Sequence, residues 1–410
     1  MISYQEAKDF VLDSVEALDP ISAPLGEVSG CVAAHEVIAH EVIPGFVNSS
    51  MDGFALRDAD TVTGATRLRV VGATRAGDAT STRVNSGQAA KVMTGAPLPD
   101  GADCVCMVEE ARLVEEDVVE IPRAISVGEY VRYPGDDVRV GDVLVRPGDE
   151  LSAVRVGVLA SQGLSSVLVH PRPRVGVLST GNELVDTGDS LRAGAIRDSN
   201  GPMLLAILRE SGVEALDLGS ARDEYDATRK RIAEGALRCD AVVTTGGVSM
   251  GDMDHVKSVI LELGAERARW MQVAIRPGKP FAFGVVGERT AVFGLPSNPV
   301  STRVSFELFV RPALRRLAGQ RALNRPIFAT VLDEPLSRHR DGKLHLVHVS
   351  ARIDASGALR VANVARQGSH LLQAIAAANA IALVPDGDGL VTGDRVSVMI
   401  LDQSAVASPS

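Results

Sequence analysis

The sequence predicts a multidomain protein of α/β and β class, with a central doubly wound α/β domain between a β-rich N-terminal region and a small C-terminal β-barrel. First, its 410 residues exceed one domain at about 100 to 200 residues per domain. Second, apolar strands alternate with helical segments in the middle of the chain. Third, short strands of period 2 lie on both sides of that middle part. We expect domains at 1–172, 173–322 and 323–405.

Composition limits the possible partners. Hydrophobic residues make up 45% of the chain, so cores can form, but aromatic residues make up only 3%, with Trp270 the single tryptophan. The formal charge is -10, and no run of Lys or Arg interrupts it. A negative surface repels phosphate backbones and anionic lipids, and base stacking needs aromatic side chains. We therefore expect neither nucleic acid nor a membrane as a partner.

The N-terminus and the cysteines indicate the compartment. Glu6, Asp9 and Asp13 stand where a signal peptide would need a basic start and an apolar stretch, and no 18-residue apolar window exists. We therefore expect a cytoplasmic protein. The four cysteines are too few and irregular for a disulfide framework, and Cys104-x-Cys106 lacks the spacing of a zinc knuckle. They are expected to be buried, reduced thiols.

The N-terminal region begins with a helix and continues in short strands. Ser3 followed by Glu6 forms a capping-box pattern, and apolar residues follow at helical spacing. After about residue 24, β-type runs separated by Gly, Pro and Asp are expected at 68–71, 104–108, 118–121 and 143–145.

In the central region strands and helices alternate. Strands are expected at 174–178, 213–218, 241–245 and 291–293, and helices at 202–212, 223–237, 254–263 and 299–317. This order predicts a βαβ sheet with helices on both faces. We expect Asn200, just before the first of these helices, to act mainly as a cap.

The last region returns to period-2 alternation, which favours a small all-β barrel. The clearest strands are 344–349 and 395–400, and turn residues are concentrated at 354–357 and 386–389.

The most informative motif follows the strand at 241–245. The chain enters Gly246-Gly247-Val248-Ser249 and then a helix, and glycines there let backbone N–H groups approach a phosphate beside a helix N-terminus. The motif predicts a phosphate cradle with Asp254 on its rim. Alternatively, Asp254 is only the N-cap of its helix.

A second acidic loop follows the strand at 174–178. It contains Glu183, and Asp223 opens the next helix. Together with Asp254 these carboxylates could place oxygen ligands around a hydrated Mg²⁺ bound to pyrophosphate. The alternative for Glu183 is a solvated loop carboxylate.

Two further loops have a composition suited to anions. Arg276 and Lys279 lie in a loop whose path is fixed by prolines, which suits an oxyanion, although surface cations are ordinarily just solvated. Residues 296–301 place Pro299 near the first turn of a helix, which is either an anion site or a rigid turn. Asp52 and Thr94, in the turn-rich loops 49–55 and 92–99, indicate no chemistry by themselves.

These motifs resemble those of the molybdopterin molybdenumtransferase family, to which the C-terminal domain of gephyrin also belongs. They occur in family order at 48–55, 93–97, 179–183, 246–249, 276–280, 296–301 and 367–370. The resemblance implies an L-shaped homodimer whose N-terminal region consists of two interleaved subdomains. It implies the last step of molybdenum cofactor biosynthesis, in which molybdate is inserted into adenylylated molybdopterin and Mg²⁺-dependent hydrolysis releases AMP. The protein partners that it suggests are the molybdopterin adenylyltransferase and the molybdoenzymes that accept the cofactor.

The resemblance also assigns roles to residues of this chain. The catalytic positions fall on Asp52, Thr94, Glu183, Asp223 and Asp254, of which the last three would hold Mg²⁺ or its waters. Asp52 and Thr94 would face the central domain, from the other subunit. The pterin and its phosphate would contact Gly181, Gly246, Gly247, Ser249, Pro296 and Pro299. Molybdate would be held by Arg276, Lys279, Ser297, Ser369 and Lys343.

The sequence departs from the family at two of these positions. Lys343 stands where members commonly have Arg, and Lys cannot form a planar bidentate contact with an oxyanion. This departure puts Lys343 in doubt as a molybdate ligand. Ser297 stands where Gly is frequent, which alters the backbone little if φ is negative there.

Two other functions fit parts of the sequence. An adenylyltransferase that makes the activated pterin shares the α/β fold and the Gly-Gly loop, but it lacks the N-terminal half and the barrel. A scaffold that binds a partner peptide would not need the acidic residues. The sequence does not distinguish molybdate from tungstate.

Overall fold

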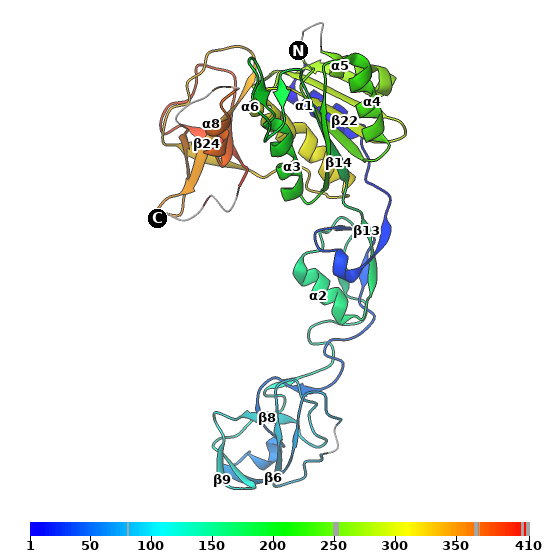
Figure 1. Ribbon diagram of the computed structural model, residues 1–410. Coiled ribbons are helices and arrows are strands. Elements are labelled where there is room, and N and C mark those ends of the chain that lie inside the picture. The colour runs from blue at the N-terminus through cyan, green and yellow to red at the C-terminus, as the bar shows by residue number, and fades with distance from the viewer. Residues whose placement is uncertain (80–81, 249–253, 365–367, 369, 403–405, 407–410) are drawn as a thin grey trace. The chain divides into compact units, whose positions relative to one another are not determined.

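The computed structural model describes residues 1–79, 82–248, 254–364, 368, 370–402 and 406. The chain forms two compact units, which Figure 1 shows together. One unit comprises Met1–Ala34, Pro147–Ser152 and Val167–Ser410, and the other comprises His35–Arg146 and Ala153–Ser166. Within the described residues, no helix is long and apolar enough to cross a membrane.

The smaller unit is built on a six-stranded sheet of order β8-β5-β7-β6-β10-β9. Its strands are β5 (Gly53–Leu56), β6 (Thr66–Thr74), β7 (Gln88–Val92), β8 (Cys104–Met107), β9 (Arg112–Glu115) and β10 (Val118–Ile121). Phe54, Leu56, Leu68 and Ile121 form the core of this sheet together with both cysteines of β8. The β-rich character expected of this part of the chain is confirmed.

Short elements complete this unit. β4 (Asn48–Ser49) pairs with β11 (Val131–Arg132), and β3 (Val37–Ile38) pairs with β12 (Val143–Val145). The helix α2 (Ala153–Ser161) was not expected from the sequence. The 3-10 helix η2 (Asp58–Asp60) also belongs to this unit, whereas η1 (Leu25–Glu27), η3 (Ala265–Arg267) and the short helix α8 (Leu372–Ala376) belong to the larger one.

The larger unit opens with α1 (Tyr4–Asp13), which has the predicted capping box. The Ser3 backbone N–H donates to Glu6 Oε2 at 2.7 Å, and the Glu6 backbone N–H donates to Ser3 Oγ at 3.1 Å. The apolar face of α1 lies in the core of the central sheet, where the ring of Phe10 meets that of Phe283 edge-on at 5.8 Å. This helix therefore shares the α/β core, although it falls in the first predicted range, 1–172.

The central sheet has the order β17-β14-β18-β22-β21-β19. β14 (Arg174–Thr180), β17 (Glu214–Ala221), β18 (Ala241–Thr245) and β22 (Thr290–Leu295) are parallel to one another. β19 (Ala268–Gln272) and β21 (Pro280–Val286) add an antiparallel edge that the sequence reasoning missed. The predicted α/β class is confirmed, with a mixed rather than purely parallel sheet.

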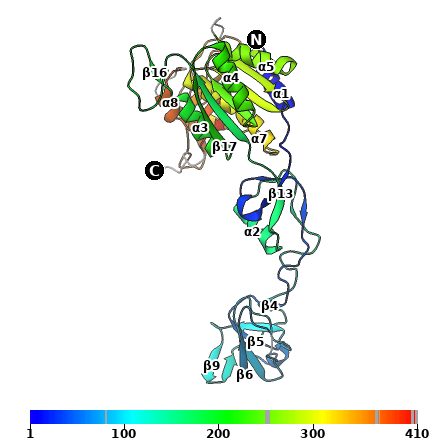
Figure 2. The same ribbon diagram turned by 45° about the vertical axis from the view of Figure 1, so that its right-hand side comes forward.

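Helices cover both faces of this sheet, as expected (Figure 2). α3 (Asn200–Glu210), α6 (Pro299–Ser305) and α7 (Arg311–Leu317) contribute with α1 to one core, and α4 (Tyr225–Ala236) and α5 (His255–Gly264) contribute to the other. The predicted helix 299–317 is interrupted by a π-helical segment at Phe306–Val310. Single-turn π segments within α-helices are rare and are frequently found at functional sites.

The C-terminal part is the predicted small barrel. Its strands are β23 (Ile327–Leu332), β24 (Leu344–Ile353), β25 (Leu359–Asn363), β26 (Ala380–Val384) and β27 (Arg395–Ile400), and the β24–β26 pairing closes the ring. β20 (Ile275–Arg276), which precedes the central strand β21, pairs with β24 in parallel. Two small sheets remain: β1 (Ile21–Pro24), β13 (Ser166–His170) and β2 (Val32–Ala33) form one, and β15 (Leu184–Val185) and β16 (Ile196–Arg197) form the other.

All four cysteines are buried and free, as the sequence predicted. Burial raises the pKa of each of these thiols above its ordinary value. They are therefore poor nucleophiles and poor metal ligands.

Candidate functional site

The loops with predicted site residues follow the carboxyl ends of adjacent parallel strands. Thr180 at the end of β14 is in register with Ala221 of β17, and Thr245 at the end of β18 is in register with Leu295 of β22. The carboxyl edge of such a sheet is where α/β proteins bind their ligands. The structure thus brings the loops at 181–183, 223, 246–247 and 296–299 to one edge.

The Gly246-Gly247 turn requires glycine at both positions. Gly246 has φ +103°, and a Cβ there would lie 2.5 Å from the carbonyl oxygen of Thr180. Gly247 has φ +64°, and a Cβ there would lie 2.7 Å from Cγ2 of Val256. The Gly246 N–H donates to the Leu295 carbonyl at 3.1 Å, so this N–H serves the sheet. Contact of Gly246 and Gly247 with the pterin or its phosphate stays a prediction, and Ser249 lies outside the described residues.

Glu183 and Asp223 lie on neighbouring loops of this edge. Asp223 Oδ2 accepts a hydrogen bond from the Asn182 N–H at 3.2 Å, and Gly181 N–H donates to the Ala221 carbonyl at 3.3 Å. A Cβ on Gly181 would lie 2.7 Å from Glu183 Oε2, so the Glu183 carboxylate folds back over this glycine. Glu183 is thereby held close to its own loop.

Asp254 is the N-cap residue of α5, but its side chain makes no capping hydrogen bond. Its Oδ2 is enclosed, and it has no hydrogen-bond partner in the part of the chain that the structure describes. A buried carboxylate oxygen without a donor is costly. The alternative that Asp254 serves only to cap its helix is therefore not supported, because the capping hydrogen bond is missing.

The three predicted metal ligands do not form a closed metal centre. Among the described residues, no three His, Cys, Asp or Glu side chains lie in a group that could hold a metal ion. Mg²⁺, however, usually keeps several waters and is held by one or two carboxylates together with substrate phosphates. The enclosed, unpartnered Asp254 Oδ2 fits that mode of binding. The assignment of Glu183, Asp223 and Asp254 to Mg²⁺ stays a prediction.

The loop with Pro296, Ser297 and Pro299 is fixed from two sides. Asn200 Nδ2 donates to Thr245 Oγ1 at 2.8 Å and to the Ser297 carbonyl at 2.6 Å. Thr302 Oγ1 donates to the Pro296 carbonyl at 2.6 Å. The prediction that Asn200 is mainly a cap is wrong, because Ser199 is the N-cap and Asn200 links two strand-end loops.

A cation-lined cavity of about 350 Å³ lies between the barrel and the segments that contain Arg276 and Val300. Arg276 lines it from β20, and Arg338, His339 and His345 line it from the barrel. Val300 of α6, one residue after Pro299, also lines it. The cavity therefore adjoins the helix that the strand-end loop begins.

Asp341 organises the cations of this cavity. Its carboxylate lies 2.9 Å from Lys343 Nζ, 3.1 Å from His345 Nε2, 3.2 Å from Arg338 and 3.6 Å from Arg276. The hydrogen bond from Lys343 comes first among the causes that hold the pKa of Asp341 well below its usual range, and burial opposes it. Asp341 is therefore a fixed negative charge.

The predicted molybdate ligands differ in their placement. Arg276 lines the cavity, but Lys343 is engaged with Asp341 and, like Lys279 and Ser297, is not among the lining side chains. Ser369 lies outside the described residues, although its neighbour Gly368 lines the cavity. Sequence reasoning missed Arg338, Asp341 and His345. The basic and histidine-rich run 338–345 was the available signal.

Asp52 and Thr94 come together in the smaller unit. Asp52 Oδ1 accepts hydrogen bonds from the Thr94 N–H at 2.7 Å and from Thr94 Oγ1 at 2.8 Å. The backbone hydrogen bond, followed by that of the hydroxyl, lowers the pKa of the exposed Asp52 below its ordinary value. The pair is thus an exposed, ionised carboxylate with a fixed orientation.

Comparisons with known proteins cover nearly the whole chain. Residues 2–163 match the MoeA N-terminal region (domain I and II), residues 176–316 match a probable molybdopterin binding domain, and residues 334–401 match the MoeA C-terminal region (domain IV). The chain is 34% identical to the molybdopterin molybdenumtransferase of Haemophilus influenzae over 91% of this chain and 92% of that protein. It is 35% identical to molybdopterin molybdenumtransferase 1 of Mycobacterium tuberculosis over 98% of this chain and 100% of that protein.

The fold is also similar to solved structures. The molybdopterin biosynthesis MoeA protein of Pyrococcus horikoshii superposes with a TM-score of 0.79 at 29% identity, over 98% of this chain and 99% of that one. Full-length similarity, the three matched regions and the ordered strand-end motifs agree with one another. The chain belongs to the MoeA family of molybdopterin molybdenumtransferases.

Proposed function

We propose that this protein inserts molybdenum from molybdate into adenylylated molybdopterin and releases AMP, the final step of molybdenum cofactor biosynthesis. One observation carries the proposal: in a single compact unit, an acidic strand-end edge adjoins a cation-lined cavity through the loop 296–299 and α6. The acidic edge can hold Mg²⁺ for the phosphates of the substrate, and the cation-lined cavity can hold the oxyanion.

The carboxylates of the strand-end edge would hold Mg²⁺ jointly with the pyrophosphate of the substrate. Asp254 offers an enclosed oxygen without a hydrogen bond, and Glu183 and Asp223 lie on the adjacent loops. The metal would neutralise charge on the phosphoryl oxygens. The reciprocal hydrogen bonds between Asn182 and Asp223 keep the Asp223 carboxylate in place before the substrate arrives.

The cavity between Arg276 and the barrel would bind molybdate. A dianion is held best by guanidinium groups whose donors are already oriented, and Asp341 orients Arg276 and Arg338 together. The glycines and prolines at 181, 246, 247, 296 and 299 would shape the pterin side. Because Lys343 is bound to Asp341, it contributes charge rather than a bidentate contact.

Asp52 and Thr94 belong to the same proposal. We place them opposite the strand-end edge in a homodimer, with the smaller unit of one protomer facing the larger unit of its partner. Their support is the fixed, ionised carboxylate of Asp52, which could orient a water molecule. The adenylyltransferase and acceptor molybdoenzymes remain proposed protein partners, and a cytoplasmic location stays a prediction.

The test is turnover of the full chain. Purified protein is mixed with adenylylated molybdopterin and Mg²⁺, with and without molybdate, and AMP release and molybdenum bound to the pterin are measured. We expect molybdate-dependent AMP release together with a metal-loaded cofactor. Arg276→Gln should raise the molybdate concentration needed for half-maximal release about tenfold or more.

A matched control separates the cavity from general charge. Arg340→Gln removes a guanidinium from the same barrel loop, where it is exposed and paired with Asp388 outside the cavity. It should leave the molybdate dependence within about twofold. AMP release that ignores molybdate would refute the proposed reaction.

A further inference from the structure

A second cation-rich cleft lies at the opposite edge of the central sheet from the strand-end site. It is lined by Arg172 just before β14 begins, by Ser211 and Val213 between α3 and β17, and by α7. β14 and β17 begin here, whereas the site described above follows their carboxyl ends. The proposed reaction makes no use of this cleft.

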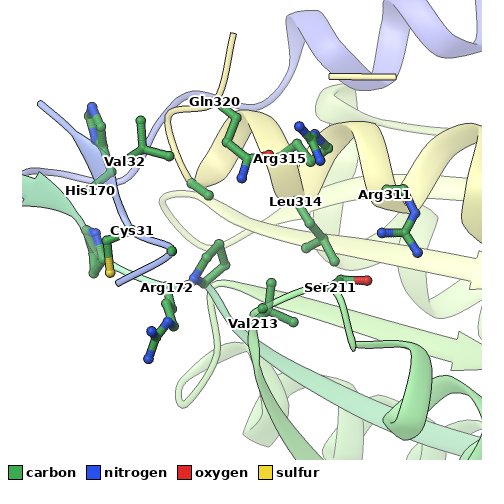
Figure 3. A pocket seen from close by; sticks show the side chains of 15 residues that line it. Cys31, Val32, His170, Arg172, Ser211, Val213, Arg311, Leu314, Arg315 and Gln320 are labelled. Carbon is green, nitrogen blue, oxygen red and sulfur yellow. The ribbon is translucent and has the colours of Figure 1, made fainter. Parts of the chain in front are cut away.

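Three arginines from two parts of the chain line the cleft, Arg172 before β14 and Arg311 and Arg315 on α7. Figure 3 shows Arg172 on one side of Val213 and Leu314, and Arg311 and Arg315 on the α7 side. The inner cavity has a volume of about 40 Å³, room for about three water molecules, and no acidic side chain lines it. It shares Arg172, Arg311 and Arg315 with a wider cleft of about 660 Å³.

The acids at the rim of the wider cleft do not offset this charge. Glu214 is 3.1 Å from Arg174, which is outside the cleft, so its charge is already engaged. Glu150 and Glu210 are the remaining acidic lining residues, against Arg172, Arg209 and Arg315, while the fourth arginine of the lining, Arg311, is bound to Glu307. The positive charge exceeds the negative charge there.

The wall behind the cleft adds further positive charge. Glu307 is fully buried, and Arg303, Arg311 and Arg325 lie 2.8, 2.6 and 2.7 Å from its carboxylate. One carboxylate thus faces three guanidinium groups, and Arg303 Nη1 makes no aligned hydrogen bond despite its 2.8 Å contact. The π-helical segment places Glu307 at this point, one turn before Arg311.

The side chains of Arg315 and Arg172 have N–H donors left for a ligand. Arg315 uses its Nε to donate to the Ala322 carbonyl at 2.5 Å, and Arg172 uses one Nη to donate to the Ser29 carbonyl at 2.6 Å. Each guanidinium has five donors, so these single bonds leave donors that can face the cleft. The Gln320 Oε1 is enclosed and has no hydrogen-bond partner within the described part of the chain.

We propose that this cleft is a second, separate anion site that binds a tetrahedral oxyanion of the phosphate class through Arg172, Arg311 and Arg315. The inner cavity suits a small ion, and a dianion would offset the excess of guanidinium groups. A hydrogen phosphate would also offer the O–H donor that Gln320 Oε1 needs. The oxyanion is either free inorganic phosphate or the phosphate group of a nucleotide that reaches in from the wider cleft.

The burial of Arg315 also favours a bound anion. Desolvation lowers the pKa of Arg315, and the neighbouring Arg311 and Arg325 lower it further, while Glu150 opposes them. An anion in the cleft would offset the cost of desolvation and reduce the repulsion between like charges.

The proposal is tested by calorimetric titration of the full chain with inorganic phosphate, at constant ionic strength so that general screening cannot mimic binding. Arg276→Gln serves as the starting protein, because it weakens phosphate binding in the molybdate cavity. In that background, Arg315→Gln and Arg172→Gln should each weaken phosphate binding about tenfold. The matched control is Arg316→Gln, the next residue of α7, which lies outside both cavities and should change the affinity less than about twofold.

Each outcome is decisive. Loss of affinity with Arg315→Gln and Arg172→Gln but not with Arg316→Gln supports the site, and equal loss in all three shows only a general effect of charge and overturns it. The absence of measurable phosphate binding also overturns it. AMP is titrated in parallel: competition with phosphate that Arg315→Gln abolishes indicates a nucleotide phosphate, and its absence indicates the free ion. Circular dichroism checks the fold of each variant, and Arg172→Gln decides if Arg315→Gln fails to fold.

Discussion

Asn182 and Asp223 hold each other through reciprocal hydrogen bonds: the Asn182 N–H donates to Asp223 Oδ2 at 3.2 Å, and the Asp223 N–H donates to Asn182 Oδ1 at 3.3 Å. The first residue follows β14 and the second follows β17, so the pair joins two strand-end loops. The pair fixes the position of the Asp223 carboxylate at the candidate site, although neither residue lies in a helix or a strand.

Asp223→Asn should separate charge from geometry. An Asn oxygen can still accept from the Asn182 N–H, so the folded structure should persist while the negative charge is lost. We expect AMP release to fall about 100-fold or more, with little change in melting temperature. The control is Asp226→Asn, in the first turn of α4, the helix that follows Asp223, where the side chain is exposed. Equal losses in the two variants would contradict a specific role for Asp223.

Gly246→Ala should destabilise the protein through two effects. The positive φ costs about 1–2 kcal/mol for a residue with a Cβ, and the approach to the Thr180 carbonyl forces the backbone to move. Gly287→Ala is the matched control, because Gly287 also has positive φ but a Cβ there meets nothing within 4 Å. Urea unfolding should show the larger loss for Gly246→Ala. A loss no larger than that of Gly287→Ala would mean that the close approach to Thr180 is unimportant.

The titration of Asp52 should reveal its bonds to Thr94. The backbone N–H and then the hydroxyl of Thr94 lower the pKa of Asp52, so its ionised form is favoured in the folded protein. The resulting stabilisation is present above the ordinary pKa of the carboxyl and is lost as the pH falls through the lowered value. Carbon NMR of labelled aspartate should show that Thr94→Val raises the pKa of Asp52 only part of the way, because the N–H remains. An unchanged titration would exclude the hydroxyl as a partner.

Glu307→Gln should be strongly destabilising. Burial alone would raise the pKa of Glu307, but the surrounding arginines hold it at about 2. Its charge therefore stabilises the fold above its ordinary pKa of 4.5, and this contribution is lost as the pH falls toward 2. Removing the carboxylate leaves three guanidinium groups without their shared counter-ion. This loss should lower the unfolding free energy by about 3–5 kcal/mol.

Glu262→Gln is the comparison for that variant. Glu262 pairs with Arg229 at 2.8 Å, but both side chains are about half exposed. Its loss should cost less than about 1 kcal/mol. Denaturant unfolding of the two variants measures the difference, and similar costs would mean that Glu307 is not an essential counter-ion.

Much of the fold follows from local sequence signals. Strands with clear apolar runs between turn residues, such as β10, β18 and β27, have the predicted bounds. The helix α2 was missed because Val154, Val156 and Val158 alternate with other residues, a pattern typical of a strand. Tertiary packing of Leu159 accompanies a helix there despite the β-branched residues.

The candidate site was predictable only where its residues share one sheet edge. Parallel strands bring their carboxyl ends together, so the loops with Glu183, Asp223 and Gly246 could be grouped from the sequence. The cavity around Arg276 could not be predicted in this way. Arg276 meets Asp341 and His345 only because β20 pairs with β24, a contact between distant segments that no local pattern announces.

The pairing of β20 with β24 makes the barrel a mechanical extension of the central domain. The Leu344 N–H donates to the Ala274 carbonyl at 2.9 Å, and Ala274 in turn donates to Ile2 at 2.8 Å. A tilt of the barrel would therefore strain main-chain bonds that reach back to the first residues of the protein. Pulling on the C-terminus should load α1 and the barrel as one body, so a protease cut between residues 317 and 327 should not release a free barrel.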